Sequence, residues 1–220
     1  MAFWQRVVPK SRVDLERPAG ATGAAADDLV RRIRERAGAA AGHGGPGALP
    51  LAPFAPATAE AVDAAEESLD FALPPLLKRV LREVGNGGFG PGRGLLGVGG
   101  GATDEHGSSL VDLYDSFSAT NSDDPGWRWP HHLVPLCSWG DSTYSCVDCS
   151  HSDGAIVTFD ANGYRPGSDI THHLTSADLS LEAWLAAWAD GADLWSLMFP
   201  LDCLIESPTD AARASASRSG

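Results

Sequence analysis

The first clear pattern of apolar positions lies between residues 58 and 85. One stripe has the i, i+3, i+7 spacing of a helix face and consists of Val62, Ala65 and Leu69. A second stripe follows it and consists of Leu77, Val80, Leu81 and Val84. Thr58 stands at the N-cap position of the first stripe, and Pro75 suits the first turn of the second, where a missing N–H costs little. We therefore predict two consecutive helices, the second of which ends at Gly85.

Three runs of β-favouring residues follow further along the chain, at residues 133–137, 143–148 and 155–159. Gly154 closes a Ser-Asp-Gly turn between the last two runs, which predicts a hairpin. A shorter apolar run between glycines, within residues 92–101, is consistent with a short strand and a loop. Together the runs predict an antiparallel sheet.

Helical patterns flank the predicted strands on both sides. Residues 110–117 predict a short helix, and Thr175 and Asp178 have the spacing of a capping box near the C-terminus. The apolar stripe that follows consists of Leu181, Trp184, Leu185 and Trp188. We interpret Trp195, together with the tryptophans of this stripe, as core packing of the last helix. The order of elements predicts an α+β fold with one antiparallel sheet of about four to six strands and helices packed at one face.

The composition divides the chain into four segments. Residues 1–26 read as a flexible N-terminal arm, and residues 27–57 as a short helix through Arg36 with an Ala/Gly/Pro-rich linker behind it. The folded domain is predicted to span residues 58–204. Residues 205–220 have the small, polar composition of a disordered tail.

The charge of the chain is strongly negative and unevenly distributed. The 16 Lys and Arg against 29 Asp and Glu give a net charge of −13. Residues 1–36 carry 8 basic and 5 acidic side chains, whereas residues 37–220 carry 8 basic and 24 acidic ones. An acidic body repels nucleic-acid phosphates and attracts basic proteins, although it also serves simple solubility. We therefore expect a basic protein partner and no nucleic acid.

The sequence contains no apolar run long enough to cross a membrane, and its N-terminus lacks the apolar core of a secretory signal. We therefore expect a cytoplasmic protein with no membrane partner. In that compartment the four cysteines are expected to be reduced thiols.

Candidate catalytic and metal-binding residues are sparse. Cys146 and Cys149 form a CxxC pair that could supply two thiolates to zinc, although two structural thiols explain the same spacing. No serine lies in a G-x-S-x-G elbow, and the glycine-rich stretch 85–101 lacks the Gly-Lys-Ser or Gly-Lys-Thr of a P-loop. We therefore expect a protein that is not an enzyme and has no cofactor, with zinc at the cysteine pair as the alternative.

Tryptophans and aspartates gather between residues 123 and 141. The candidate partner-binding residues in this stretch are Asp123, Asp124, Trp127, Trp139 and Asp141. Aromatic anchors beside carboxylates suit an interface for a basic protein. The alternative is that Trp129 and Trp139 belong to the core while Trp127 covers a loop.

Several short motifs occur in a fixed order along the chain. The positions that define them are Leu73, Pro74, Asn86, Gly87, Gly88, Gly140 and Asp148. With the strands and the final helix that accompany them, they resemble the SUKH superfamily of the Smi/Knr cell-wall-regulator type. The resemblance covers roughly residues 58–195. The glycine-rich residues 90–101 and the long N-terminal extension depart from the compact family form, so nothing is carried over to them.

The resemblance implies a protein that works by binding. Many bacterial SUKH proteins are immunity proteins that neutralise polymorphic toxins, often nucleases, and fungal members regulate cell-wall synthesis. The leading hypothesis is therefore immunity against a basic toxin. The alternative is a regulatory or scaffold protein that acts on a host complex without a toxin.

Overall fold

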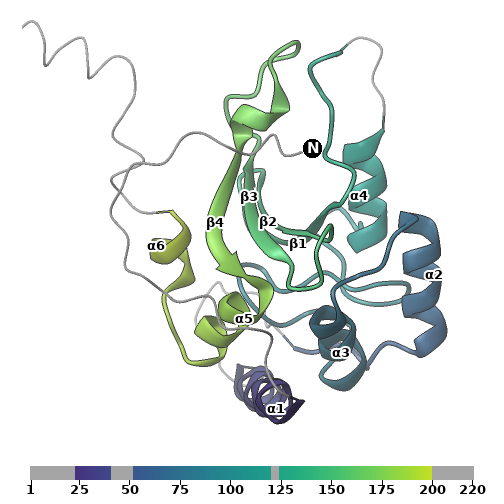
Figure 1. Cartoon of the computed structure of the whole chain (residues 1–220), viewed down its shortest axis with the longest axis vertical. Helices are drawn as coiled ribbons and strands as arrows, with labels where there is room; N and C mark the ends of the chain where they lie inside the picture. The colour runs from purple at the N-terminus through teal and green to yellow at the C-terminus, as the bar shows by residue number, and fades with distance from the viewer. Residues whose placement is uncertain (1–22, 41–51, 120–123, 200–220) are drawn as a thin grey trace, which may run out of the picture.

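The computed structural model describes residues 23–40, 52–119 and 124–199. Its elements are, in chain order, α1 (Gly23–Ala40), α2 (Ala59–Leu69), α3 (Pro75–Glu83), α4 (Leu110–Ser118), β1 (Leu133–Gly140), β2 (Thr143–Asp148), β3 (Ala155–Asp160), the 3-10 helix η1 (Ile170–His173), β4 (Leu174–Ser180), α5 (Leu181–Ala189) and α6 (Leu194–Met198). The four antiparallel strands form one sheet in the order β1-β2-β3-β4 (Figure 1). The predicted α+β fold with one antiparallel sheet is confirmed.

Helices α2 and α3 form where the two apolar stripes predict them. The Thr58 side chain caps α2 by accepting a hydrogen bond from the Ala61 N–H at 3.2 Å. The side chains that the two helices bury are Val62, Ala65, Leu69, Leu77, Val80 and Leu81. A left-handed Asp70 ends α2, and Pro74 stands at the N-cap of α3. Local signals therefore position this helix pair correctly.

Tight turns set the register of the sheet. Asp141 and Ser142 connect β1 to β2, and both have positive φ (45° and 58°), as a two-residue type I′ hairpin requires. β2 pairs with β3 without interruption, from Thr143 opposite Asp160 to the far end of both strands. Gly154, at φ 59°, stands just before β3, as the turn prediction required.

The last strand, β4, was not predicted. The capping-box reading of Thr175 and Asp178 is wrong, because both residues lie in β4 and α5 begins only at Leu181. Ser180 is the true cap of α5, since its hydroxyl accepts a hydrogen bond from the Ala183 N–H at 3.1 Å. β4 pairs with β3 through a register shift that includes Asp178 at φ 54°. Pairing with the open edge of β3 therefore outweighs the local helix signal.

Both faces of the sheet are covered, whereas the sequence predicted helices at one face. Successive strand residues point to opposite faces, so Tyr144 and Ser145 in β2 mark the two sides. The Tyr144 ring lies 5.4 Å from the ring of Phe117 in α4. The Ser145 hydroxyl contacts the sulfur of Met198 in α6. In Figure 1, α4 and α6 accordingly lie on opposite sides of the strands.

The glycine-flanked run after α3 is a loop that follows the outer edge of β1. The described residues 91–101 contain no strand. Two backbone hydrogen bonds nevertheless join this loop to β1, from the Arg93 N–H to the Ser138 oxygen (2.8 Å) and from the Leu96 N–H to the Leu136 oxygen (2.7 Å). The loop thus protects one edge of the sheet from pairing with another chain.

Helix α1 is longer than predicted and packs on the domain. It starts at Gly23 and runs to Ala40, so it includes residues that the sequence assigned to the N-terminal arm and to the linker. Its buried side chains are Leu29, Val30, Ile33 and Ala37, and it packs against α5 and α3. The remaining linker residues 41–51 lie outside the described part of the chain.

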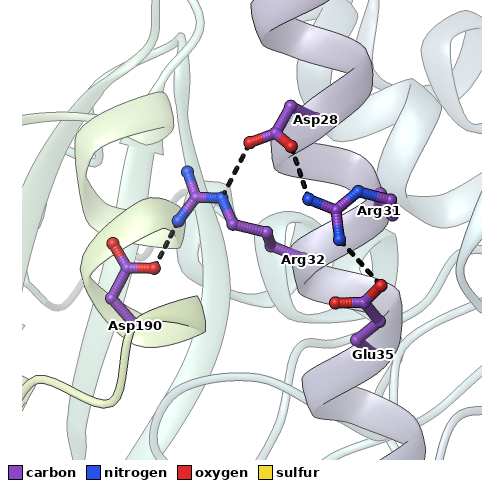
Figure 2. A network of polar contacts seen from close by, with 5 residues as sticks. All are labelled: Asp28, Arg31, Arg32, Glu35 and Asp190. Carbon is purple, nitrogen blue, oxygen red and sulfur yellow. Dashed lines mark hydrogen bonds and ion pairs between the residues drawn. The ribbon is translucent and has the colours of Figure 1, made fainter.

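Polar contacts reinforce the seam between α1 and the domain. Arg32 binds Asp28 on its own helix and Asp190 at the end of α5, while Arg31 binds Asp28 and Glu35 (Figure 2). The guanidinium of Arg36 lies 5.1 Å from the Trp188 ring centre.

A second set of contacts joins α1 to α3. Arg34 donates to the terminal carbonyl of α3 at Glu83 (2.9 Å), and Arg79 pairs with Asp27 (2.8 Å). The α1 side chains therefore satisfy groups at the ends of two domain helices, Glu83 on α3 and Asp190 on α5.

Replacing Ile33 with alanine should lower the free energy of unfolding by about 2–4 kcal/mol, because the fully buried side chain leaves a cavity between α1 and the domain. Arg31→Ala is the matched control on the exposed face of the same helix and should have a much smaller effect, because exposed ion pairs contribute little to stability. Urea denaturation of both variants measures the difference. Equal, small effects would mean that α1 does not contribute to the core.

Candidate protein-binding site

The Asn86-Gly87-Gly88 turn holds three segments of the chain together. The Asn86 side chain is 4% exposed, donates to the Val98 oxygen (3.1 Å) and accepts from the Val98 N–H (2.9 Å). Its backbone N–H donates to Ala55, and its carbonyl accepts from Ala102. Asn86 thus joins the end of α3 to residues 52–57 and to the loop at residues 95–102.

The two glycines of this turn are required by backbone conformation and by space. Gly87 and Gly88 have φ values of 77° and 82°. A Cβ atom on Gly87 would lie 2.5 Å from the Leu95 oxygen, and one on Gly88 would lie 2.5 Å from the Ala52 oxygen. The Asn-Gly-Gly motif therefore builds the framework, and no exposed side chain of the motif is available for a partner.

The other motif residues also have structural roles within the domain. Leu73 is buried, and its N–H donates to the Glu66 carboxylate at 2.7 Å. Gly140 has a φ of 94° beside the Arg93 guanidinium. Asp148 ends β2 and accepts a hydrogen bond from the Ser150 N–H at 2.9 Å.

Two of the candidate partner-binding residues, Asp124 and Trp127, take part in internal contacts. Asp124 is buried and accepts hydrogen bonds from the Gly167 N–H (2.7 Å) and the Tyr164 hydroxyl (2.8 Å). These bonds, the Gly167 bond first, hold the pKa of Asp124 below its usual value, and burial beside this carboxylate raises the pKa of Tyr164 to about 12. The Trp127 indole donates to the Phe117 oxygen at 2.6 Å. Asp123 lies outside the described residues.

The other two candidates, Trp139 and Asp141, lie elsewhere. Trp127 packs on Phe117 and Phe159 at the α4 face of the sheet. The Trp139 indole instead donates to the Ser145 hydroxyl (2.8 Å) on the α6 face. Asp141 is exposed in the β1–β2 turn. The structure thus places Trp127 and Trp139 on opposite faces and brings Trp139 close to the turn that holds Asp141.

Helix α6 adds exposed apolar side chains that sequence reasoning missed. Trp184 and Trp188 are core residues as predicted, but the same prediction is wrong for Trp195, which is 47% exposed. Leu197 is 51% exposed. Gly191, at φ 86°, separates α5 from α6, and Asp193 caps the new helix. The Asp-Gly break was the signal in the sequence that the tryptophan series does not continue along one helix.

Of the described cysteines, Cys137 and Cys146 are buried and Cys149 is partly buried. Burial raises the pKa of Cys149 to about 12 and that of Cys146 well above its usual value. Cys146 lies within β2, whereas Cys149 follows the end of that strand. Among the described residues no group of three or more His, Cys, Asp or Glu side chains is arranged to hold one metal ion. In the same residues no helix is long and apolar enough to span a bilayer.

The fold and the exposed surface define an acidic α+β module with a glycine-rich turn as its framework. Residues 56–187 match the sequence model of the SMI1/KNR4 family (SUKH-1). The match spans more than half of the chain, so the protein belongs to this family, whose members bind partner proteins such as toxins and are generally not enzymes. Neither a search of curated proteins nor a search of solved structures found a match.

Some elements of the structure lie within the residues that match the family model and others lie outside them. The Asn86 turn, the sheet and most of α5 lie within residues 56–187, whereas α1 precedes this region and α6 follows it. Helices α1 and α6 both pack against α5.

Replacing Asn86 with alanine should lower the free energy of unfolding by about 1–3 kcal/mol, because the buried N–H and carbonyl of Val98 lose their partners. Chemical denaturation measures the loss. Asn162→Ala is the control, since Asn162 is exposed and its side-chain amide donates to the Asp141 carbonyl at the surface. A loss no larger than that of the control would contradict the framework role of Asn86.

Asp124 should make stability depend on pH at the acidic end. Its folded pKa lies below the unfolded value, so its contribution is present above the unfolded pKa of about 3.9 and is lost as pH falls through the folded pKa. The difference in free energy of unfolding between the wild type and Asp124→Asn should therefore shrink from about pH 6 to about pH 2. Denaturation across this range tests it, and a difference that grows toward acid would refute it.

Proposed function

We propose that this protein is an immunity protein that binds and neutralises a basic toxin domain, with a nuclease as the favoured class. The proposal rests on the family and on one observation, the distribution of charge over the domain. We further propose that it acts in the cytoplasm, by binding and not by catalysis.

The charge of the described residues is sharply segregated. Helices α1 and α3 carry seven of the ten basic side chains in these residues together with four acidic ones, a net charge of +3. The remaining described residues carry three arginines and nineteen acidic side chains, a net charge of −16. Many of the basic groups on α1 and α3 pair with neighbouring carboxylates. A partner approaching any other side of the domain therefore meets negative charge.

This distribution favours a partner of opposite charge. A nuclease needs Lys and Arg around its substrate groove to neutralise phosphates, and an acidic protein can occupy the same groove. Charge attraction of this kind mainly accelerates association and excludes wrong partners, while buried aromatic anchors slow dissociation. An acidic domain with exposed tryptophan has both features.

A second candidate function is a Smi/Knr-type regulator or scaffold that acts on a host complex without a toxin. The observation in its favour is α1, because an ordered helix ahead of the family unit offers an additional surface for assembly. Arg31 and Glu35 lie on the exposed face of α1, where they form an ion pair with each other and, within the described residues, not with the rest of the domain. This face of α1 is therefore open to another protein.

The test pairs the chain with a candidate toxin-like domain drawn from the neighbourhood of its gene. Co-expression of the chain should restore growth of cells that produce the domain, and the purified proteins should form a 1:1 complex. The association rate should fall by at least about tenfold as salt is raised from low to high concentration, because charge drives the encounter. Double-stranded DNA is the control ligand and should not bind.

Failure of the domain to bind at any salt concentration would refute the immunity proposal. Stable recovery of the chain in a host assembly that contains no toxin would instead support the regulatory function.

A further inference from the structure

An exposed aromatic surface surrounds α6. We define the α6 surface as Trp139, Trp195, Leu197 and Phe199. Trp195 is 47% and Leu197 51% exposed, while Trp139 and Phe199 are partly buried. The ring of Trp195 lies 4.4 Å from that of Phe199 and 5.7 Å from that of Trp139. The rings of Trp139, Trp195 and Phe199 thus form one aromatic cluster at the edge of the domain. Leu197 is a further exposed apolar side chain, on the other flank of the same helix, because residues two apart on a helix face different directions.

The core holds this surface in place. Leu194 and Met198, on the opposite side of α6, are buried. The Met198 sulfur accepts hydrogen bonds from the Trp184 indole (3.0 Å) and the Ser145 hydroxyl (3.8 Å). The Ser145 hydroxyl in turn accepts from the Trp139 indole at 2.8 Å. These contacts fix α6 and the Trp139 ring in the free protein. The conformational entropy that these groups lose on binding a partner is therefore small.

Carboxylates border the α6 surface. Asp193 caps α6, and Asp141 lies two residues after Trp139 in the β1–β2 turn. Asp160 is opposite Thr143 in the adjoining strand, and Asn162 joins these two aspartates by donating to the Asp141 carbonyl and to the Asp160 carboxylate. None of the three carboxylates forms an ion pair with another described residue. The nearest arginine at this turn, Arg93, is paired with Glu105 at 3.0 Å.

Exposed apolar side chains that gather in one patch with a polar rim are typical of interaction sites. The charge of the rim then determines which partners can bind. A second copy of this chain would bring its own aspartates against these three, with both chains at a net charge of −13. A partner with an apolar pocket and surrounding Lys or Arg side chains would complement both the centre and the rim.

We propose that the α6 surface is the docking site for the basic protein partner, with Trp195 inserted into an apolar pocket, Leu197 contacting the partner from the other flank of α6, and the carboxylates of Asp141, Asp160 and Asp193 facing cationic side chains. The identity of the partner as a toxin domain rests on the proposed function. The location of the site rests on the geometry of α6 and of the β1–β2 turn beside it. Trp139, Asp141 and Asp160 lie within the residues that match the family, whereas α6 follows them.

The chain offers a matched control for the aromatic centre. Phe54 is the third large apolar side chain that is exposed among the described residues, and it is 47% exposed, as is Trp195. It lies beside Gly88 at the Asn86 turn, and its backbone N–H donates to the Gly87 oxygen. Trp195→Ala and Phe54→Ala therefore remove equally exposed rings from two different places.

The binding test measures the dissociation constant of the purified toxin-like domain for the full-length chain by calorimetry. Trp195→Ala should weaken binding on the order of thirtyfold, the effect of a central aromatic anchor, and Leu197→Ser should weaken it on the order of tenfold. Phe54→Ala should bind as the wild type does. The thermal transition of each variant verifies that it is folded.

The charge test uses pairs of substitutions that change the net charge equally. Asp141→Asn with Asp160→Asn should lower the association rate on the order of tenfold, whereas Asp63→Asn with Glu67→Gln, on α2 at the other side of the sheet (Figure 1), should change it little. Equal reductions by both pairs would mean that the whole acidic body steers the partner and that the α6 rim has no special part.

The outcomes separate the location from the function. Wild-type affinity in Trp195→Ala and Leu197→Ser would overturn the α6 site and leave the immunity function intact. A wild-type chain that does not bind the domain would overturn the function and the assigned partner together. A dimer in light scattering that Trp195→Ala converts to a monomer would show that a second copy occupies the surface, contrary to the proposal.

Discussion

The side-chain amide of Asn86 binds both backbone groups of Val98, and much of the domain depends on this pair of hydrogen bonds. It fixes the loop that follows α3. Two residues of that loop contact other elements. The Gly97 carbonyl accepts a hydrogen bond from the N–H of Leu110 at the start of α4, and the Leu96 N–H donates to a carbonyl of β1. One buried amide thus connects the end of α3, the edge of the sheet and the helix that covers one face. In a site of low dielectric such a group is valuable when fully satisfied and costly when it is not.

Local signals explain which parts of the fold could be predicted. The cap at Thr58, the prolines at the start of α3 and the β-favouring runs of β1 to β3 act within a few residues, so the sequence predicts these elements correctly. β4 could not be found in this way, because its formation depends on the unpaired edge of β3, far away in the chain. The capping signal at Thr175 is genuine as a pattern, but the true cap lies at Ser180. The extent of α1 was likewise hidden, since its position depends on contacts with α3 and α5.

The candidate site shows the same limit. Composition and spacing identify the relevant residue types, aromatic rings beside aspartates, but they do not reveal which face of the sheet each ring occupies. Asp124 is directed inward by Gly167 and Tyr164, residues about forty positions away. Trp195 is directed outward because Met198 and Leu194 occupy the inner side of α6. The uneven charge is visible in the sequence, but only the packing of α1 beside α3 shows that the basic side chains of these two helices lie together, where those of α1 bind carboxylates and carbonyls. The resulting division leaves a basic side, an acidic body and one fixed apolar surface.

The most direct test of docking at the α6 surface is an NMR spectrum of the tryptophan indole N–H groups. It is recorded on isotope-labelled protein as the basic toxin-like domain is added. The indoles of Trp127, Trp129 and Trp184 donate to internal acceptors away from the α6 surface or beneath it. If the partner docks at the α6 surface, the signals of Trp139 and Trp195 shift or broaden while those of Trp127 and Trp129 stay in place. Movement of the Trp127 and Trp129 signals with Trp139 and Trp195 unchanged would place the partner on the α4 face and contradict docking at the α6 surface.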